Sequence, residues 1–414
     1  MNNKSNSFGE FETCQICVIN SSSGLGGAER VLLNVLKPWL RENKRKESSV
    51  FIPGSGPLSQ EFEASGWDVH HFDLGARFSQ VGDSPVRQEG FLVLLLNRVQ
   101  AIPDLFRCIW SLKKKIKTIN ADVFLANGFK AQILAALVLP KTKSLIWFMQ
   151  DFISCRKSVS RIIPWIWRKG IYVIADSRAV AADVSKLLPL CPIAVWHNTV
   201  DVAKFSPGNG DPNWLDLEAG FSGDFDGLKI GLVATYARWK GHMFFMEAAR
   251  DVLNKTTKKV RFYIIGGPIY GSRESQWTVD ELKVFAQKLG LTKILGFVGF
   301  QKDTSGVYRA LDIVVHASTN PEPFGQVIIE AMACGKPVII ADSGGASEIG
   351  THGKTCLYHQ PCNVDSLANA ILQIIEDEDL RIKIGNAARI EAIEKFNTSL
   401  VENRWIGLLE GIGT

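Results

Sequence analysis

The sequence predicts an α/β protein built from two doubly wound domains. Short strand-like apolar runs alternate with longer helix-like runs, and this alternation occurs twice along the chain. The 414 residues exceed the size at which a single hydrophobic core stops growing, so two domains of about 200 residues are expected. Residues 205–228 are rich in Gly, Pro, Asp and Asn and show no periodicity. We therefore expect a first domain at 1–204, a linker at 205–228, a second domain at 229–396 and a C-terminal helix at 397–414.

In the first domain, short apolar runs bounded by turn residues are typical of strands that are buried on both faces. Longer stretches with helical periodicity lie between them and supply the covering layers. Strands are expected at Cys14–Asn20, Ser49–Pro53, Asp68–Phe72, Val123–Ala126, Leu145–Met149, Ile171–Ala175 and Ile193–Trp196, and helices at Ala28–Arg41, Phe91–Lys117 and Arg178–Leu188.

The second domain repeats this pattern after the linker. Ligands in doubly wound sheets bind outside the carboxyl ends of the strands, so binding residues are expected in the loops that follow strands. The last helix, Thr398–Leu409, follows the natural end of the domain. Strands are expected at Lys229–Ala234, Val260–Ile265, Ile294–Phe300, Ile313–His316 and Val338–Ala341.

The positive charge of the chain is concentrated in its first half. The net charge is +5, and residues 1–202 carry 25 Lys and Arg against 17 Asp and Glu. Basic residues gather in Lys37–Lys46, Arg107–Lys117 and Arg156–Lys169, and the last of these contains two tryptophans. Such segments are typical of contact with an anionic membrane surface or a lipid-diphosphate acceptor, or of amphipathic helices with solvated basic faces. No nucleic-acid-binding motif accompanies the charge, which argues against a nucleic acid partner.

The sequence predicts a cytoplasmic protein. No apolar run reaches the length of about 20 residues that is needed to cross a bilayer, and the first residues lack the apolar core of a secretion signal. Eight cysteines are scattered through the expected strands and helices, which fits reduced thiols better than a disulfide framework. The basic first domain adds the expectation of peripheral contact with the inner face of the membrane.

The most informative motif places two carboxylates, Glu322 and Glu330, eight positions apart across a loop that leads into a helix. Pro323 biases Glu322 toward an extended conformation, and Gly325 lets the backbone approach a ligand closely. The free N–H groups at the start of the helix and the two carboxylates could then bind a polyhydroxylated ligand such as ribose or hexose. The alternative is two solvated carboxylates that flank an ordinary helix start.

Further motifs follow this pair of carboxylates. Ala331–Pro337 closes the helix with a glycine and a proline, and Gly344–Glu348 forms a turn after a second buried strand. The run from Val314 to Glu348 closely resembles the donor-binding half of the retaining nucleotide-sugar transferases of glycosyltransferase family 4 (glycosyl transferases group 1). Similarity to this family extends over nearly the whole chain. The resemblance implies the GT-B fold, in which two Rossmann-like domains face a central cleft and the C-terminal helix crosses back to the first domain.

The resemblance also implies roles for individual residues. Glu322 would hold the donor hexose or stabilise positive charge at its anomeric carbon, Glu330 would bind ribose hydroxyls, and Lys240 would stabilise the diphosphate. The arginine that usually lies five residues before this lysine is replaced by Thr235, so Arg238 is expected to supply the missing charge. An exposed surface cation is the alternative for Lys240 and for Arg238. The other implied donor-binding residues are Gly26, Gly27, Phe324, Gly325, Gln326, Val327, Gly344 and Gly345.

The glycine loop Ser21–Arg30 follows the first strand and opens a helix. Such a loop can present N–H groups to a diphosphate, or it can be a plain tight turn. It matches the Gly-Gly-Ala-Glu motif of the family, which implies that Gly26 and Gly27 approach the donor phosphate or the acceptor.

Four further residues are candidates for contacts with the sugar or the acceptor. His197 and Asn198 lie in Val195–Asp201, which resembles the segment just before the linker of the family. Many relatives carry a histidine after the fifth strand, and here Gln150 and Asp151 occupy that region. Either could contact the sugar or the acceptor, and Asp151 could instead cap the next turn.

The resemblance implies a retaining hexosyltransferase that moves a sugar from a nucleotide-sugar donor to a glycan or lipid-linked acceptor, in surface polysaccharide biosynthesis. Neither a cofactor nor a metal is expected, because Asp224 and Asp226, which have the spacing of a metal-binding pair, fall in the linker. Two alternatives remain: a catalytically inactive protein that binds nucleotide sugars, and a sugar-nucleotide epimerase of the same architecture.

Overall fold

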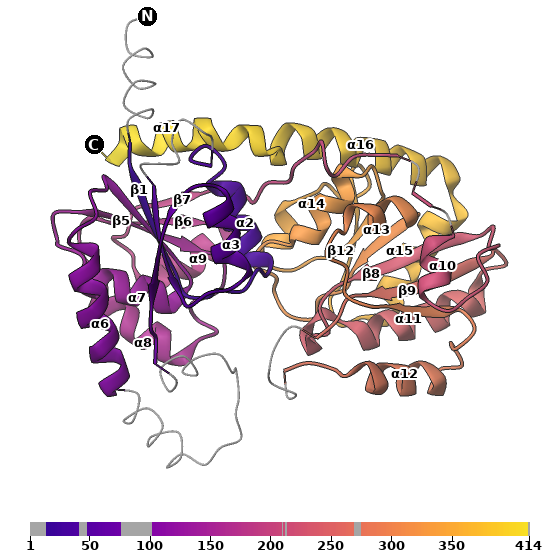
Figure 1. The fold of residues 1–414 in the computed structure, drawn as a ribbon. Helices are drawn as coiled ribbons and strands as arrows, with labels where there is room; N and C mark the ends of the chain where they lie inside the picture. Colours follow the sequence, from indigo (N-terminus) through magenta and orange to yellow (C-terminus); the bar gives the residue numbers. More distant parts are fainter. Residues whose placement is uncertain are drawn as a thin grey trace, which may run out of the picture. The chain divides into compact units, whose positions relative to one another are not determined.

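The chain divides into two compact units in the computed structural model, which describes residues 14–40, 48–75, 102–208, 210–211, 213–268 and 275–412. The first unit comprises Met1–Asn198 and Thr398–Thr414, and the second comprises Thr199–Asn397 (Figure 1). Each unit has one parallel sheet with helices on both faces. This arrangement confirms the predicted fold class.

The sheet of the first unit has seven strands in the order β3-β2-β1-β4-β5-β6-β7, and all neighbouring strands are parallel. From β1 the chain builds one side of the sheet through β2 and β3 and then returns to build the other side from β4. The register of β1 and β4 pairs Asn20 with Asn127 at the carboxyl ends of these two central strands. The strands are β1 (Ile16–Asn20), β2 (Ser49–Pro53), β3 (Asp68–Phe72), β4 (Val123–Asn127), β5 (Ser144–Met149), β6 (Ile171–Ala175) and β7 (Ile193–Val195).

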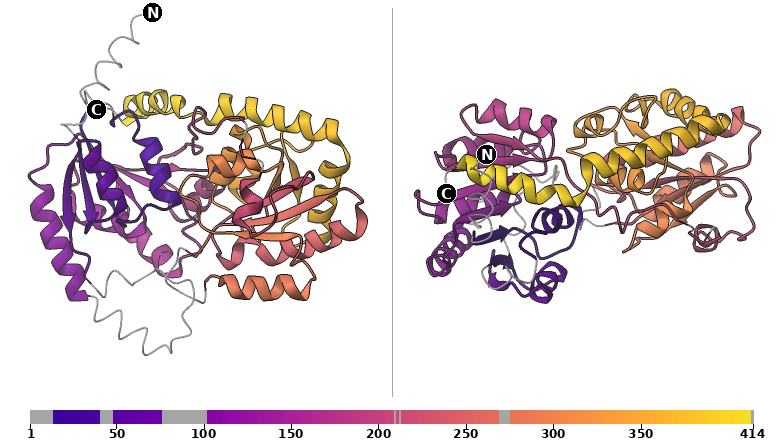
Figure 2. Two further views of the ribbon diagram at one scale, coloured as in Figure 1. Left: turned by 45° about the vertical axis from the view of Figure 1, so that its right-hand side comes forward. Right: turned by 90° about the horizontal axis from the view of Figure 1, so that it is seen from above.

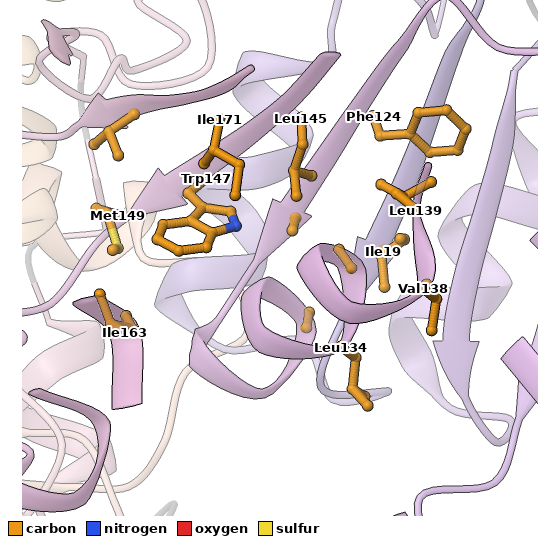
Figure 3. Packing of buried hydrophobic residues seen from close by; sticks show 14 of the residues in the cluster. Ile19, Phe124, Leu134, Val138, Leu139, Leu145, Trp147, Met149, Ile163 and Ile171 are labelled. Carbon is orange, nitrogen blue, oxygen red and sulfur yellow. The ribbon is translucent and has the colours of Figure 1, made fainter. Parts of the chain in front are cut away.

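Two hydrophobic clusters cover the two faces of this sheet. One joins the sheet to α6, α7, α8 and α9, and the other joins it to α2, α3 and α17. Figure 3 shows part of the first cluster, in which side chains of β1 and β5 pack with those of α7 and α8. The helices are α2 (Gly27–Val35), α3 (Pro57–Ala64), α6 (Ile102–Ile116), α7 (Phe129–Val138), α8 (Lys157–Ile166), α9 (Arg178–Leu187) and α17 (Val401–Ile412).

The C-terminal helix α17 belongs to the first unit, as predicted (Figure 2). Its Trp405 is fully buried, and the indole lies edge-on to Trp39 at 4.7 Å and to Trp196 at 5.0 Å between ring centroids. The indole nitrogen donates a hydrogen bond to the carbonyl of Val35 at 2.8 Å. Burial of this aromatic cluster anchors the end of the chain on the first sheet.

The sheet of the second unit has six parallel strands in the order β10-β9-β8-β11-β12-β13. The strand order again reverses between two central strands, here β8 and β11, which are parallel neighbours. Strand β13 was not predicted, because its three residues are too few to show a pattern. The strands are β8 (Leu228–Val233), β9 (Val260–Ile265), β10 (Leu295–Val298), β11 (Ile313–His316), β12 (Val338–Ala341) and β13 (Leu357–His359).

Helices cover both faces of this second sheet. One face packs against α11, α12 and α15, and the other packs against α10, α13, α14 and α16. The helices are α10 (Trp214–Glu218), α11 (His242–Lys255), α12 (Val279–Lys288), α13 (Ser305–Ala310), α14 (Gln326–Ala333), α15 (Val364–Glu376) and α16 (Glu378–Phe396), with 3-10 turns η2 (Arg238–Lys240), η3 (Gly345–Glu348) and η4 (Thr398–Leu400).

The stretch 205–228, which was expected to be a linker, forms part of the second unit. It contains α10, whose Asp216 is fully buried and pairs with Lys229 of β8 at 2.8 Å and with Arg261 of β9 at 2.6 Å. Burial alone raises the pKa of Asp216, but hydrogen bonds from Lys229, Tyr263 and Arg261 more than offset it and hold the pKa below its ordinary value. These ionic contacts attach the stretch to the sheet.

Candidate functional site

An ion pair between Lys240 and Glu322 lies at the carboxyl ends of the two central strands of the second unit. Lys240 is in η2, which follows β8, and Glu322 is in the loop that follows β11. The Lys240 ammonium donates to both carboxylate oxygens of Glu322, at 2.7 and 2.8 Å. Because β8 and β11 are neighbours, the loops that follow them meet at one edge of the sheet.

Backbone contacts hold these two loops together. The N–H of Thr319 donates to the carbonyl of Trp239 at 2.7 Å. Gly241, just after Lys240, has φ +77°, and a Cβ built on it would lie 1.8 Å from the carbonyl oxygen of Ala317. Only glycine fits this left-handed position and this close approach. Gly241 therefore fixes the distance between the lysine loop and the end of β11.

Glu322 accepts hydrogen bonds from two further buried side chains. The Ser318 hydroxyl donates to Oε2 at 2.8 Å, and Nε2 of His316 lies 3.3 Å from the same oxygen and 3.0 Å from Oγ of Ser318. Because the hydroxyl hydrogen of Ser318 is committed to Glu322, Nε2 of His316 must carry a hydrogen to bond either neighbour. His316, Ser318 and Lys240 thus present donors to a single carboxylate.

This arrangement keeps Glu322 ionised. Burial alone raises the pKa of the carboxyl, but the Lys240 ammonium and the hydrogen bond and charge of His316 outweigh it and hold the pKa well below its ordinary value. Glu322 is therefore a fixed negative charge in a buried position, with an exposed side-chain fraction of 10%.

The predicted donor-binding residues Gly344 and Gly345 lie against the backbone of Glu322. The N–H of Gly345 donates to the carbonyl of Glu322 at 2.7 Å. Gly344 has φ +68°, and a Cβ on it would lie 2.4 Å from the same carbonyl oxygen. The two glycines therefore position Glu322, and their contact with a donor stays a prediction.

Glu330, four residues into α14, lies within hydrogen-bond distance of two hydroxyls of the loop and helix that follow β10. The hydroxyl of Tyr308 donates to its carboxylate at 2.9 Å, and that of Thr304 donates to the same oxygen at 3.3 Å. Burial, the charge of Glu330 and this hydrogen bond raise the pKa of Tyr308 well above its ordinary value, so the phenol stays a neutral donor. Glu330 is half-buried, and its contact with ribose hydroxyls stays a prediction.

The other candidates around α14 divide into core and loop residues. Phe324 is 2% exposed and packs edge-on to Phe396, so its side chain belongs to the core. Gly325 precedes the helix with φ +115°, a conformation that favours glycine. The side chain of Gln326 donates to the carbonyl of Thr199 at 3.2 Å, and Val327 is half-buried at the edge of a core cluster.

Arg238 lies on the same turn as Lys240, but its guanidinium points to another part of the unit. It stacks over the ring of Trp277 at 3.8 Å and faces the Glu281 carboxylate at 3.8 Å. Its side chain is 41% exposed. The structure brings Lys240 to Glu322 and gives Arg238 a partner of its own, so a role for Arg238 at the diphosphate stays a prediction.

In the first unit, the glycine loop ends at the start of α2. The N–H of Gly26 donates to the Glu29 carboxylate at 3.0 Å, and Gly27 is exposed as the first residue of the helix. The side chain of Gln150 reaches the carbonyl of Ala28 at 3.1 Å. Gln150 therefore lies beside the glycine loop, and its contact with the sugar or the acceptor stays a prediction.

Asp151 and His197 have partners within the first unit. Asp151 accepts a hydrogen bond from the N–H of Phe152 at 2.9 Å and pairs with Arg156 at 3.0 Å, which favours the turn-capping alternative. The carbonyl of His197 accepts from Arg404 of α17 at 2.6 Å, and Asn198 is buried.

The residues that sequence reasoning missed are His316 and Ser318. They lie six and four positions before Glu322: His316 is the last residue of β11, and Ser318 follows two residues later with its hydroxyl against both His316 and Glu322. A polar pair that ends an otherwise apolar strand was the available signal. Asp226, of the predicted metal-type pair, binds Lys259 at 2.9 Å. Among the described residues, no group of three or more His, Cys, Asp or Glu could hold a metal ion.

In a comparison with known proteins, most of the second unit matches a family model. Residues 224–391 match the family model of the glycosyl transferases group 1. The chain is 31% identical over 201 residues to D-inositol 3-phosphate glycosyltransferase of Corynebacterium jeikeium, over 48% of this chain and 47% of that protein. It is 26% identical over 190 residues to mannosylfructose-phosphate synthase of Agrobacterium fabrum, over 45% and 41%. The chain thus spans about half the length of the curated relatives it matches.

Solved structures extend the similarity to nearly the whole chain. Anabaena HepE in complex with UDP and glucose has a TM-score of 0.76 at 25% identity, over 96% of this chain and 99% of that one. A glycosyltransferase from Rickettsia africae has a TM-score of 0.73 at 21% identity, over 97% and 99%. Together with the two Rossmann-like parallel sheets, these neighbours show that the chain has the GT-B α/β fold.

The Lys240–Glu322 pair predicts a specific stability change. Lys240→Met leaves a buried carboxylate without its ammonium, so we expect the free energy of unfolding to fall by about 3 kcal/mol at neutral pH, and the double variant with Glu322→Gln to recover much of this loss. The folded-state pKa of Glu322 is depressed, so its contribution is complete above the ordinary carboxyl pKa of about 4.3 and is lost as the pH falls below it. Urea unfolding from neutral to acidic pH measures both effects.

The exposed pair of Lys259 and Asp226 is the matched control, because its side chains are 70% and 71% exposed. Lys259→Met should not measurably change unfolding at any pH. Equal effects of Lys240→Met and Lys259→Met would contradict the description of Glu322 as a buried, compensated charge.

Proposed function

We propose that the protein is a retaining hexosyltransferase that moves a sugar from a nucleotide-sugar donor to a glycan or lipid-linked acceptor. The observation that carries this proposal is the ion pair of Lys240 and Glu322 at the carboxyl ends of β8 and β11, with Glu330 on the helix that follows. The family match of residues 224–391 and the relatives named for glycosyl transfer support it.

In the proposed reaction, the bond between the anomeric carbon and the diphosphate oxygen breaks while the acceptor oxygen bonds to the same face of the sugar. The acceptor proton passes to the leaving phosphate oxygen, so no protein nucleophile is required. Lys240 neutralises charge that develops on the departing diphosphate. Ionised Glu322 stabilises positive charge at the anomeric carbon, and Glu330 accepts hydrogen bonds from the ribose hydroxyls.

The pairing of Lys240 with Glu322 gives the lysine two functions in this scheme. Without donor, its ammonium offsets the buried charge of Glu322. When a diphosphate arrives, the same ammonium has donors for both anions, because Lys carries three N–H bonds. His316 and Ser318 remain as hydrogen-bond donors to Glu322, so the carboxylate keeps its orientation while Lys240 turns toward the diphosphate.

We infer that the donor carries UDP, because structures of the similar HepE hold UDP, UDP with glucose, and UDP-glucose. UDP-glucose is accordingly the first donor to test. The proposed setting is surface polysaccharide biosynthesis, and the proposed reaction uses no metal or other cofactor.

We also propose peripheral contact of the first unit with an anionic membrane at the cytoplasmic face. Helices α6, α7 and α8 lie side by side on one face of this unit (Figures 1 and 2). Phe106 and Trp110 of α6 are 67% and 70% exposed, and Trp165 of α8 is 90% exposed. Lys114 of α6 lies 5.9 Å from the Trp110 ring. Exposed aromatics with neighbouring ammonium groups suit the headgroup region of anionic lipids.

Two further observations concern this membrane proposal. No helix among the residues that the structure describes is long and apolar enough to cross a bilayer. The remaining basic segment, Lys37–Lys46, lies largely outside the described residues. The proposal therefore rests on α6 and α8.

A nucleotide-sugar panel tests the enzymatic proposal. We expect the wild type to bind UDP in a thermal-shift assay and to consume UDP-glucose, and we expect Glu322→Gln and Lys240→Met each to lower kcat by about 100-fold or more, because each removes a charge that acts in the transition state. Lys259→Met is the control and should keep full activity. Binding without turnover of any UDP, ADP or GDP sugar would instead indicate a catalytically inactive binding protein, and conversion of the donor without an acceptor would indicate an epimerase.

Vesicle co-sedimentation tests the membrane proposal. We expect the wild type to bind vesicles that contain phosphatidylglycerol, and to be released by high salt. Trp110→Ala combined with Trp165→Ala should weaken binding about tenfold, whereas Leu190→Ala, which removes a side chain that is 80% exposed elsewhere in the unit, should not. Equal binding of neutral and anionic vesicles, or unchanged binding by the double tryptophan variant, would contradict the membrane proposal.

A further inference from the structure

A chain of three side-chain amides crosses the carboxyl ends of β1, β4 and β5 in the first unit. Nδ2 of Asn20 donates to the carbonyl of Ser22 at 2.7 Å, and Nδ2 of Asn127 donates to Oδ1 of Asn20 at 2.7 Å. Nε2 of Gln150 donates to Oδ1 of Asn127 at 2.7 Å and to the carbonyl of Ala28 at 3.1 Å. The chain thus begins and ends on backbone carbonyls of the glycine loop and α2.

These two ends fix the orientation of every amide between them. A backbone carbonyl only accepts hydrogen bonds, so Asn20 must turn its NH₂ toward Ser22 and its oxygen toward Asn127. Asn127 must then turn its NH₂ toward Asn20 and its oxygen toward Gln150. Gln150 must turn its NH₂ inward, where it meets two acceptors. Flipping any one amide would set oxygen against oxygen or NH₂ against NH₂.

At the outer end of this chain of amides, Oε1 of Gln150 is the polar atom that takes no part in the hydrogen bonds described above. Within the described residues it has no hydrogen-bond partner, and Gln150 is half-buried at the edge of the sheet. Asn20 and Asn127 are 1% and 3% exposed, so they cannot turn to solvent. The neighbouring charged residue, Asp151, is bound to Phe152 and Arg156. Gln150 therefore presents a neutral acceptor whose direction is set by two buried residues.

The loops around this atom are also fixed. Gly128, just after β4, has φ +85°, and a Cβ on it would lie 2.3 Å from Oγ of Ser21. This close approach packs the β4–α7 loop against the glycine loop. The amide chain is thus built between two loops at the edge where the ligands of doubly wound sheets bind.

We propose that Asn20 and Asn127 are positioning residues that hold Oε1 of Gln150 as the acceptor of a hydrogen bond from a sugar hydroxyl. The inference rests on the proposed function and names the chemical group that the first unit recognises. An outward carbonyl oxygen accepts a hydroxyl hydrogen and disfavours a phosphate, and its capacity does not change with pH. The hydroxyl belongs either to the transferred sugar or to the acceptor.

The central test compares Gln150→Met with Gln132→Met. Both replace a glutamine of the first unit by an apolar side chain of similar length, but Gln132 donates to the carbonyl of Phe148 outside the amide chain. With UDP-glucose as donor and glucose as acceptor probe, we expect Gln150→Met to lower kcat/KM by about tenfold and Gln132→Met to leave it unchanged. UDP affinity should be unchanged in both variants.

Two reactions separate the sources of the hydroxyl. If the transferred sugar supplies it, Gln150→Met lowers hydrolysis of UDP-glucose without acceptor as much as transfer to glucose. One of the monodeoxy UDP-glucose donors should then be insensitive to the substitution. If the acceptor supplies it, only transfer falls. Unchanged hydrolysis and unchanged transfer in Gln150→Met, with an active wild type, would overturn this inference alone.

Two further readouts distinguish positioning from a merely structural role. Asn127→Leu should lower kcat/KM as much as Gln150→Met, and the double variant should show no further loss, because both remove the same hydrogen bond. Gln150→His should add an ionisation at about pH 6 to 7 to the rate profile, which the wild type lacks at this position. Additive losses, or a Gln150→His profile identical to the wild type, would contradict the proposal. A wild type that neither binds nor consumes any nucleotide sugar would contradict the proposed function, and this inference with it.

Discussion

The arrangement of the second unit depends on compensating one buried negative charge. A carboxylate as deeply buried as that of Glu322 would cost several kcal/mol without partners, and it would become protonated instead. Lys240, Ser318 and His316 supply the compensation from two loops and one strand end. Their convergence requires β8 and β11 to be neighbours and the glycine at position 241 to admit the carbonyl of Ala317. The ion pair of Lys240 and Glu322 therefore depends on both the strand order and Gly241.

The two units share the same order of central strands but place different side chains at the carboxyl ends of these strands. In each sheet the strand order reverses between two central parallel strands, and the loops that follow these strands meet at one edge. The second unit places an ammonium and two carboxylates in this region, whereas the first places a chain of neutral amides that ends at Gln150. In the account proposed here, the charged groups act on the diphosphate and the anomeric centre, and the neutral oxygen recognises a hydroxyl.

Much of the fold could be predicted from the sequence, because strands buried on both faces appear as compact apolar runs. The five expected strands of the second sheet are present in the structure. Strand β13 and helix α10 could not be predicted, since very short elements show no periodicity. Glu322 and Lys240 could be assigned to one site because strand ends converge and because their motifs resemble a family, but the ion pair between them was not predicted. The side-chain direction of Arg238 could not be predicted, since its stacking on Trp277 depends on a loop contact distant in sequence. His316 and Ser318 required the three-dimensional position of Glu322.

The most direct test of the central claim is the contribution of Lys240 to the binding of a diphosphate. Isothermal titration calorimetry measures the binding of UDP and of uridine to the wild type and to Lys240→Met, at a temperature where both are folded. The comparison of the two ligands distinguishes the contribution of the diphosphate from that of the nucleoside. We predict that Lys240→Met weakens UDP binding by about tenfold or more, as expected for the loss of a hydrogen bond to a charged group, and leaves uridine binding unchanged. Unchanged affinity for UDP, or an equal loss for uridine, would contradict it.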